Sequence, residues 1–132
     1  ALYLGCMDGN ETIFRAAYGR KHLYLTAETL SPENKYGQME ILLCNDEGKT
    51  VTIRYDVNGA AEGCGDGITL VTRRGKSSEG KEGFCAEIAI PYSELKTEKG
   101  DYLKIHAEAG NGETFTGSDK EQPESWLRIR ID

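Results

Sequence analysis

Hydrophobic and polar residues alternate along most of this chain, most clearly between Gly83 and Leu95 (GFCAEIAIPYSEL). Every second residue from Phe84 to Ile90 is apolar, which is the period of a strand with one face on a core. Pro91 has no N–H to donate to a neighbouring strand, so we expect the strand to end there. Ser93 and Glu94 then follow in a short turn or helical turn.

The other segments also have the pattern of strands, separated by turn residues. Gly19-Arg20-Lys21 and Asn45-Asp46-Glu47-Gly48 predict tight hairpin turns, whereas residues 58–66 and 75–83 predict irregular loops. The strands are expected at Leu2–Met7, Thr12–Tyr18, His22–Leu30, Gln38–Cys44, Lys49–Val57, Ile68–Arg73, Tyr102–Ala109 and Trp126–Ile131, with a short segment at Thr114–Thr116. About eight to ten short strands without an amphipathic helix predict an all-β, antiparallel sandwich of the jelly-roll or immunoglobulin-like kind.

Alternation within these strands predicts which side chains face the core. In the strand Lys49–Val57 the residues Val51, Ile53, Tyr55 and Val57 share one face. In Tyr102–Ala109 we expect one apolar face turned inward and one polar face turned outward. The inward residues are Leu103, Ile105 and Ala107, and the outward residues are Lys104, His106 and Glu108.

Length and charge limit the number of domains and the kinds of partner that we expect for this chain. Residues 1–132 are enough for one core, so we expect a single domain. The net charge of −6 argues against nucleic acid or an anionic membrane as partner, because both need a basic surface. No apolar run approaches the ~20 residues that span a bilayer. The chain starts at Ala1 without a signal sequence, so we expect a module excised from a larger protein.

The four cysteines, Cys6, Cys44, Cys64 and Cys85, are widely spaced. Without a C-x-x-C pair they do not predict a zinc ribbon or a thioredoxin-type motif. Two disulfides, in any of three pairings, and four reduced thiols both remain open. Cys44 and Cys85 occupy polar-side positions of their strands, which makes them the first pair to test.

The sequence contains few patterns that are typical of catalysis, and we expect that this chain is not an enzyme. The chain lacks G-x-S-x-G, H-E-x-x-H and a glycine-rich phosphate loop before a helix. His22 and His106 lie in separate strands without an obvious nucleophile as partner. Met39 and His106 could be the axial ligands of a haem, as in some sandwiches. A strand methionine at an inward position is more often part of the core, so we favour that interpretation.

Four stretches carry a resemblance to a known family. They are FRAAYGRKHLYLTAE, SPENKYGQMEILLCND, GFCAEIAIPYSEL and PESWLRIRI, and together they span most of the chain. In order and spacing they resemble the family 9 carbohydrate-binding modules, which are attached to glycosidases and polysaccharide lyases. The third stretch resembles the family's run E-x-x-I-P-aromatic-x-x-L. The family's usual opening segment is missing here.

The resemblance implies a ligand-binding site made of aromatic and charged residues. It places the loop aromatic at Tyr36, the strand glutamate at Glu40 and the arginine of the next strand at Arg54. Phe115 is the nearest substitute for a second sandwiching aromatic. Alternation independently puts Glu40 and Arg54 on one face, where an ordinary cross-strand salt bridge is the alternative. We expect Trp126 to pack in the core, and Tyr92 to be structural.

The function implied by the resemblance is that of a non-catalytic module. It would bind a polysaccharide or oligosaccharide and thereby target the catalytic domain of a larger glycan-degrading enzyme, secreted or at the cell surface. The family often holds structural calcium, for which Asp46, Glu47, Asp56 and Asp66 are candidates. The alternative is a structural or protein-interaction sandwich that has lost the sugar site.

Overall fold

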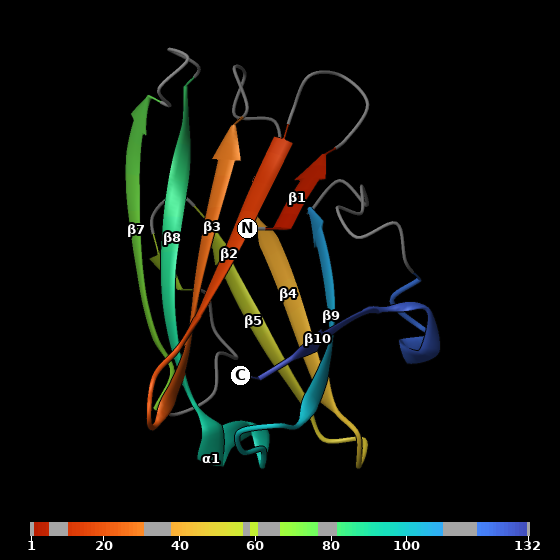
Figure 1. Ribbon diagram of the computed structural model, residues 1–132. Coiled ribbons are helices and arrows are strands. Elements are labelled where there is room, and N and C mark those ends of the chain that lie inside the picture. Colours follow the sequence, from red (N-terminus) through yellow and green to blue (C-terminus); the bar gives the residue numbers. More distant parts are fainter. Residues whose placement is uncertain are drawn as a thin grey trace.

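Two antiparallel five-stranded sheets lie face to face in the computed structural model (Figure 1). The structure describes residues 2–5, 11–30, 38–56, 59–60, 67–76, 82–109 and 119–131, with side chains described in 15–28, 38–56, 67–73, 85–108 and 119–131. Sheet A contains, in order, β1 (Leu2–Gly5), β2 (Glu11–Tyr18), β3 (His22–Leu30), β8 (Glu82–Pro91) and β7 (Thr69–Lys76). Sheet B contains β10 (Leu127–Arg130), β9 (Tyr102–Ala109), β4 (Met39–Asn45), β5 (Thr50–Asp56) and β6 (Gly59–Ala60). The predicted all-β, antiparallel sandwich is confirmed.

The strand with the clearest alternation is β8, which lies between β3 and β7. Pro91 pairs with His22 at the end of this ladder, and the helix α1 (Tyr92–Leu95) follows at once. Strands β3 and β9 have the predicted bounds. The predicted loop 75–83 is shorter than expected, because β7 and β8 stay paired as far as Lys76 and Glu82. The predicted segment Thr114–Thr116 lies outside the described residues.

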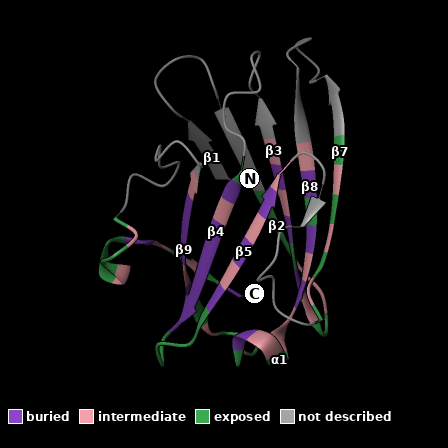
Figure 2. Cartoon of the chain, turned by 180° about the vertical axis from the view of Figure 1, so that it is seen from behind, coloured by how far each residue is buried: buried purple, intermediate pink, exposed green. Residues whose placement is uncertain are grey.

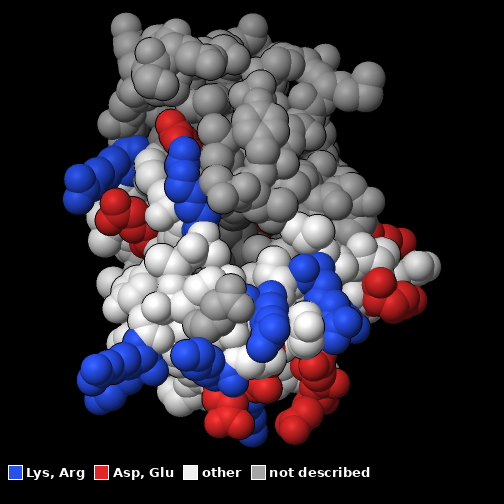
Figure 3. All heavy atoms as spheres, viewed as in Figure 1, with Lys and Arg blue, Asp and Glu red and all other residues white. Residues whose placement is uncertain are grey.

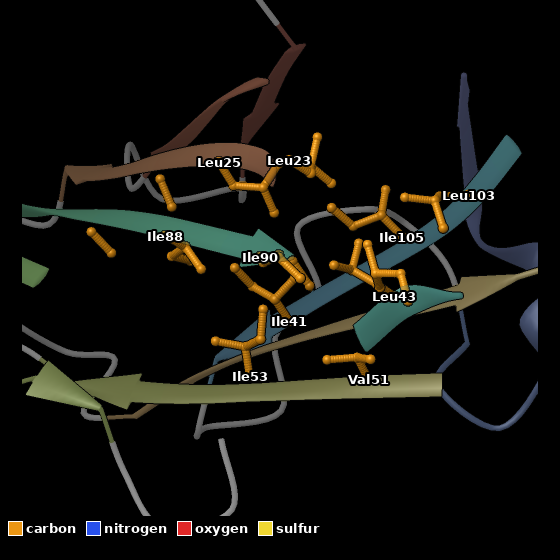
Figure 4. Packing of buried hydrophobic residues seen from close by; sticks show 14 of the residues in the cluster. Leu23, Leu25, Ile41, Leu43, Val51, Ile53, Ile88, Ile90, Leu103 and Ile105 are labelled. Atoms are coloured by element: carbon orange, nitrogen blue, oxygen red, sulfur yellow. The ribbon is translucent and has the colours of Figure 1, made fainter. Parts of the chain in front are cut away.

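The core lies between the sheets and is built from their inner faces. Figure 4 shows Leu25 and Ile88 of sheet A and Ile41 and Ile53 of sheet B among the side chains that fill this space. Each fully buried side chain of this size contributes about 1.5–3 kcal/mol through the hydrophobic effect. The predicted inward residues of β5 and β9 are buried: Val51, Ile53, Tyr55, Leu103, Ile105 and Ala107.

A second, smaller cluster covers the outer face of sheet B. It consists of the buried residues Leu42, Cys44 and Trp126. As a consequence, β4 is buried along nearly its whole length, as Figure 2 shows. The expectation that Trp126 packs in a hydrophobic core is confirmed, and the cluster that it joins lies on the outer face of sheet B rather than between the sheets. Leu127 and Ile129 turn inward, so Trp126, one residue before the strand, turns outward.

Buried Asn45 ties the β4–β5 turn to α1. Its Nδ2 donates to the carbonyl oxygen of Leu95 at 2.9 Å, and its Oδ1 accepts from the backbone N–H groups of Glu47 at 2.9 Å and Lys49 at 2.8 Å. Gly48 in this turn has φ +88°, which glycine adopts without steric cost. The lower end of the sandwich in Figure 1 is therefore cross-linked by one side chain.

The structure decides two questions that the sequence left open, one about a disulfide and one about haem. Cys44 and Cys85 are both free thiols, and they lie on the outer faces of opposite sheets, so they cannot form a disulfide. Met39 is fully buried in the core, whereas His106 is on the outer face of the same sheet. The two cannot ligate one haem. Cys6 and Cys64 lie outside the described residues.

Candidate functional site

Glu40 and Arg54 form the centre of the candidate site on the outer face of sheet B. They are direct partners in the register of β4 and β5, and Arg54 Nε lies 2.6 Å from Glu40 Oε2. The Glu40 side chain is 14% exposed and that of Arg54 is 42% exposed. The prediction that these two residues share a face is confirmed, and the guanidinium has a side open to solvent.

Lys120 extends this pair into a network. Its Nζ lies 2.5 Å from Glu40 Oε1 and 3.6 Å from Glu108 Oε1. Glu40 and Glu108 are paired in the β4–β9 ladder, where two like charges side by side repel each other. Lys120 lies between the two carboxylates and neutralises that repulsion. Sequence reasoning missed it, although two outward glutamates on adjacent strands signal the need for a cation.

His106 and Trp126 support the network from the sheet side. The His106 side chain is fully buried, and its Nε2 lies 3.0 Å from Glu108 Oε2. Its ring centroid is 5.7 Å from that of Trp126 at an interplanar angle of 30°. The Trp126 Nε1–H donates to the carbonyl oxygen of Asp119 at 2.8 Å. This bond fixes the residue that precedes Lys120, so the position of the lysine depends on the buried tryptophan.

The charges of the network persist near neutral pH. Burial raises the pKa of the Glu40 carboxyl, but the hydrogen bonds and charges of Lys120 and Arg54 outweigh burial and bring it below its ordinary value of 4.5. The hydrogen bond to Glu40 raises the pKa of Lys120 above 10.5. The face therefore offers fixed guanidinium and ammonium donors beside carboxylate acceptors, which suits a ligand rich in hydroxyl groups.

The two predicted aromatic residues of the site, Tyr36 and Phe115, lie outside the described residues. In sequence, Tyr36 comes just before β4, which begins at Met39 next to Glu40. Phe115 falls between β9, which ends at Ala109 after Glu108, and the segment that begins at Asp119. The structure thus brings Glu40 and Arg54 together and leaves the aromatic pair as a prediction.

The predicted calcium ligands do not converge where they are described. Asp46 and Glu47 lie in the β4–β5 turn at one end of β5, and Asp56 ends that strand at the other. Asp66 lies outside the described residues. Within the described part of the chain, no three His, Cys, Asp or Glu side chains are grouped so as to hold a metal ion. Calcium binding stays a prediction.

No family model matches the chain, and comparisons with curated proteins and with solved structures gave no match. Among the described residues, no helix has the length and apolar character needed to cross a membrane.

Proposed function

We propose that this chain is a non-catalytic carbohydrate-binding module. The observation that carries the proposal is the Glu40–Arg54 pair, held at 2.6 Å on the outer face of sheet B with the guanidinium partly open to solvent. The resemblance to family 9 carbohydrate-binding modules points to the same two residues. In the proposed complex, Arg54 donates to sugar hydroxyl groups and Glu40 accepts from them.

The proposed ligand is a polysaccharide or oligosaccharide. Tyr36 and Phe115 would supply rings for the C–H faces of the sugars, since an aromatic ring buries apolar surface while the charged groups bind hydroxyls. The module would belong to a secreted or cell-surface glycan-degrading protein. Weak attachment beside a catalytic domain raises the local concentration of that domain on its substrate.

A structural or protein-interaction module is the second candidate, and one observation favours it. Both carboxylate oxygens of Glu40 already have cationic partners, Arg54 and Lys120. A network that is satisfied internally can hold the 119–126 segment on sheet B without any ligand. The two candidate functions predict different effects of replacing Arg54. A sugar-binding module loses affinity for its sugar, whereas a structural module loses only stability.

An affinity gel or glycan array with matched variants separates them. Arg54→Met keeps an apolar stem but removes the donors, Tyr36→Ala removes the predicted stacking ring, and Arg73→Met changes an exposed arginine on the other sheet. We expect wild type and Arg73→Met to bind the same glycan, and the two site variants to bind at least tenfold more weakly. Sugar binding is refuted if wild type binds no plant, microbial or host glycan. The site is wrong if both site variants bind like wild type.

A further inference from the structure

A hollow lies at the opposite end of the sandwich from Glu40. It has a volume of about 900 Å³, within the range of small-molecule sites. Glu40 is near the start of β4, whereas Asn45 at the end of β4 reaches α1, beside the hollow. The β2–β3 turn, the start of α1 and the loop after α1 form its walls. The lining residues used below are Tyr18, Arg20, Lys21, His22, Tyr92, Thr97, Glu98 and Lys99.

Hydrogen bonds between the three wall segments hold this cavity open. The Tyr92 hydroxyl donates to the carbonyl oxygen of Gly19 at 3.0 Å, and the Tyr92 backbone N–H donates to that of Lys21 at 3.0 Å. Thr97 N–H donates to the carbonyl oxygen of Tyr92 at 3.2 Å. A ligand entering here would cost little entropy in the walls, because they are already cross-linked.

The cavity is cationic in a protein that is acidic overall. Arg20, Lys21 and Lys99 line it against one carboxylate, Glu98, whereas the whole chain has a net charge of −6. Within the described part of the chain these three cations form no ion pair. Figure 3 shows Lys and Arg side chains over the lower part of this face, where Figure 1 places the β2–β3 turn. Unpaired cations around a preformed hollow attract an anionic ligand.

Rings and hydroxyl groups accompany the charges. Tyr18, His22 and Tyr92 line the cavity. Burial, and then the nearby phenols of Tyr18 and Tyr24, raise the pKa of Tyr92. The Thr97 hydroxyl oxygen is buried without a hydrogen-bond partner among the described residues.

We propose that this cavity binds an acidic saccharide, a sugar ring that carries a carboxylate or sulfate group. The tyrosine rings suit the C–H face of a sugar, the three cations suit its anionic group, and Glu98 suits its hydroxyls. A free phosphate would use neither the rings nor Glu98, and a long nucleic acid would be repelled by the remaining acidic surface. This site is separate from the proposed carbohydrate site at Glu40 and does not depend on it.

Isothermal titration with defined oligosaccharides tests the proposal. The ligands are an oligogalacturonate for the carboxylate, a sulfated oligosaccharide for the sulfate, and cellotetraose and inorganic phosphate as controls. Arg20→Glu is compared with Arg73→Glu, because both replace an exposed arginine by the same charge and only Arg20 lines the cavity. Arg54→Met reports on the other site.

We expect at least one acidic oligosaccharide to bind wild type, Arg73→Glu and Arg54→Met alike, and Arg20→Glu at least tenfold more weakly. Which of the two acidic ligands binds identifies the anionic group. The proposal is overturned if neither binds, if phosphate binds with the same dependence on Arg20, or if Arg73→Glu weakens binding as much as Arg20→Glu. If only Arg54→Met lost binding of the acidic oligosaccharide, the ligand would bind at the Glu40 site, and the proposal would also be overturned. If cellotetraose fails to bind, the result counts against the proposed function at Glu40 and leaves the acidic-saccharide proposal unaffected.

Discussion

Replacing Asn45 by alanine tests how the lower end of the sandwich is held together. The side chain is only 4% exposed and makes three hydrogen bonds of 2.8–2.9 Å, to the carbonyl oxygen of Leu95 and the N–H groups of Glu47 and Lys49. The bond to Leu95 connects two segments that are far apart in sequence, and the other two hold the β4–β5 turn. Alanine removes all three and leaves the Leu95 carbonyl without this donor.

The expected cost follows from the number of bonds. A net contribution of about 0.5–1.5 kcal/mol for each hydrogen bond gives a loss of roughly 3 kcal/mol in the free energy of unfolding. For a domain of this size, 1 kcal/mol corresponds to about 3–5 °C in melting temperature, so we expect a decrease of roughly 10 °C.

Urea unfolding followed by circular dichroism, with a thermal melt, measures this loss. Asp46→Ala is the matched control, because Asp46 is an exposed neighbour in the same turn and should change stability by less than about 0.5 kcal/mol. If Asn45→Ala also stays within about 0.5 kcal/mol of wild type, Asn45 does not link the turn to α1 in solution, and the reasoning is refuted.

Three further predictions concern the outer face of sheet B and calcium. Trp126→Ala should lower the free energy of unfolding by about 3–5 kcal/mol in urea titrations, since it empties the small cluster with Leu42 and Cys44; a loss below about 1 kcal/mol would contradict that packing. The folded-state pKa of Glu40 is depressed, so its stabilisation is present above about pH 4.5 and lost as pH falls through the folded pKa. Urea titrations should therefore find Glu40→Gln less stable than wild type at pH 7, with a gap that narrows as the pH falls below about 4.5, and an unchanged gap would argue against the ion pairs. Calcium should raise the melting temperature above that in EDTA if the predicted site exists, and equal melting temperatures would exclude it.

The individual strands are predictable because alternation and turn residues are local signals. The pattern predicts His22–Leu30 and Tyr102–Ala109 with their bounds, and the turn at Gly48 follows from residue type. The outward position of Trp126 is also in the sequence, because inward Leu127 and Ile129 require it. Trp126 is buried in a hydrophobic cluster as predicted, and alternation decides that this cluster lies on the outer face of the sheet.

The sites are harder to predict, because their parts come from distant segments. Glu40 and Arg54 can be paired from the sequence, since a hairpin makes their strands neighbours. Lys120 cannot be assigned to the site from the sequence, because its position depends on the pairing of β4 with β9 and on the hydrogen bond from Trp126 to Asp119. The cavity at the α1 end of the sandwich is formed by the β2–β3 turn and residues 91–99, and no local sequence pattern predicts that these two segments come together.

The order of strands has a consequence for how the chain folds. Hairpins β2–β3 and β4–β5 form from neighbouring residues, but the free edges of β3 and β4 gain their hydrogen-bonding partners only when the later strands β8 and β9 pair with them. Such non-local pairing typically takes milliseconds to seconds. A chain emerging from the ribosome would therefore carry unpaired strand edges, and the edge of β4 stays open until β9 is made, a state that invites aggregation. A truncation before Tyr102 should leave β4 without its partner strand β9, and such a fragment should not reach the native fold.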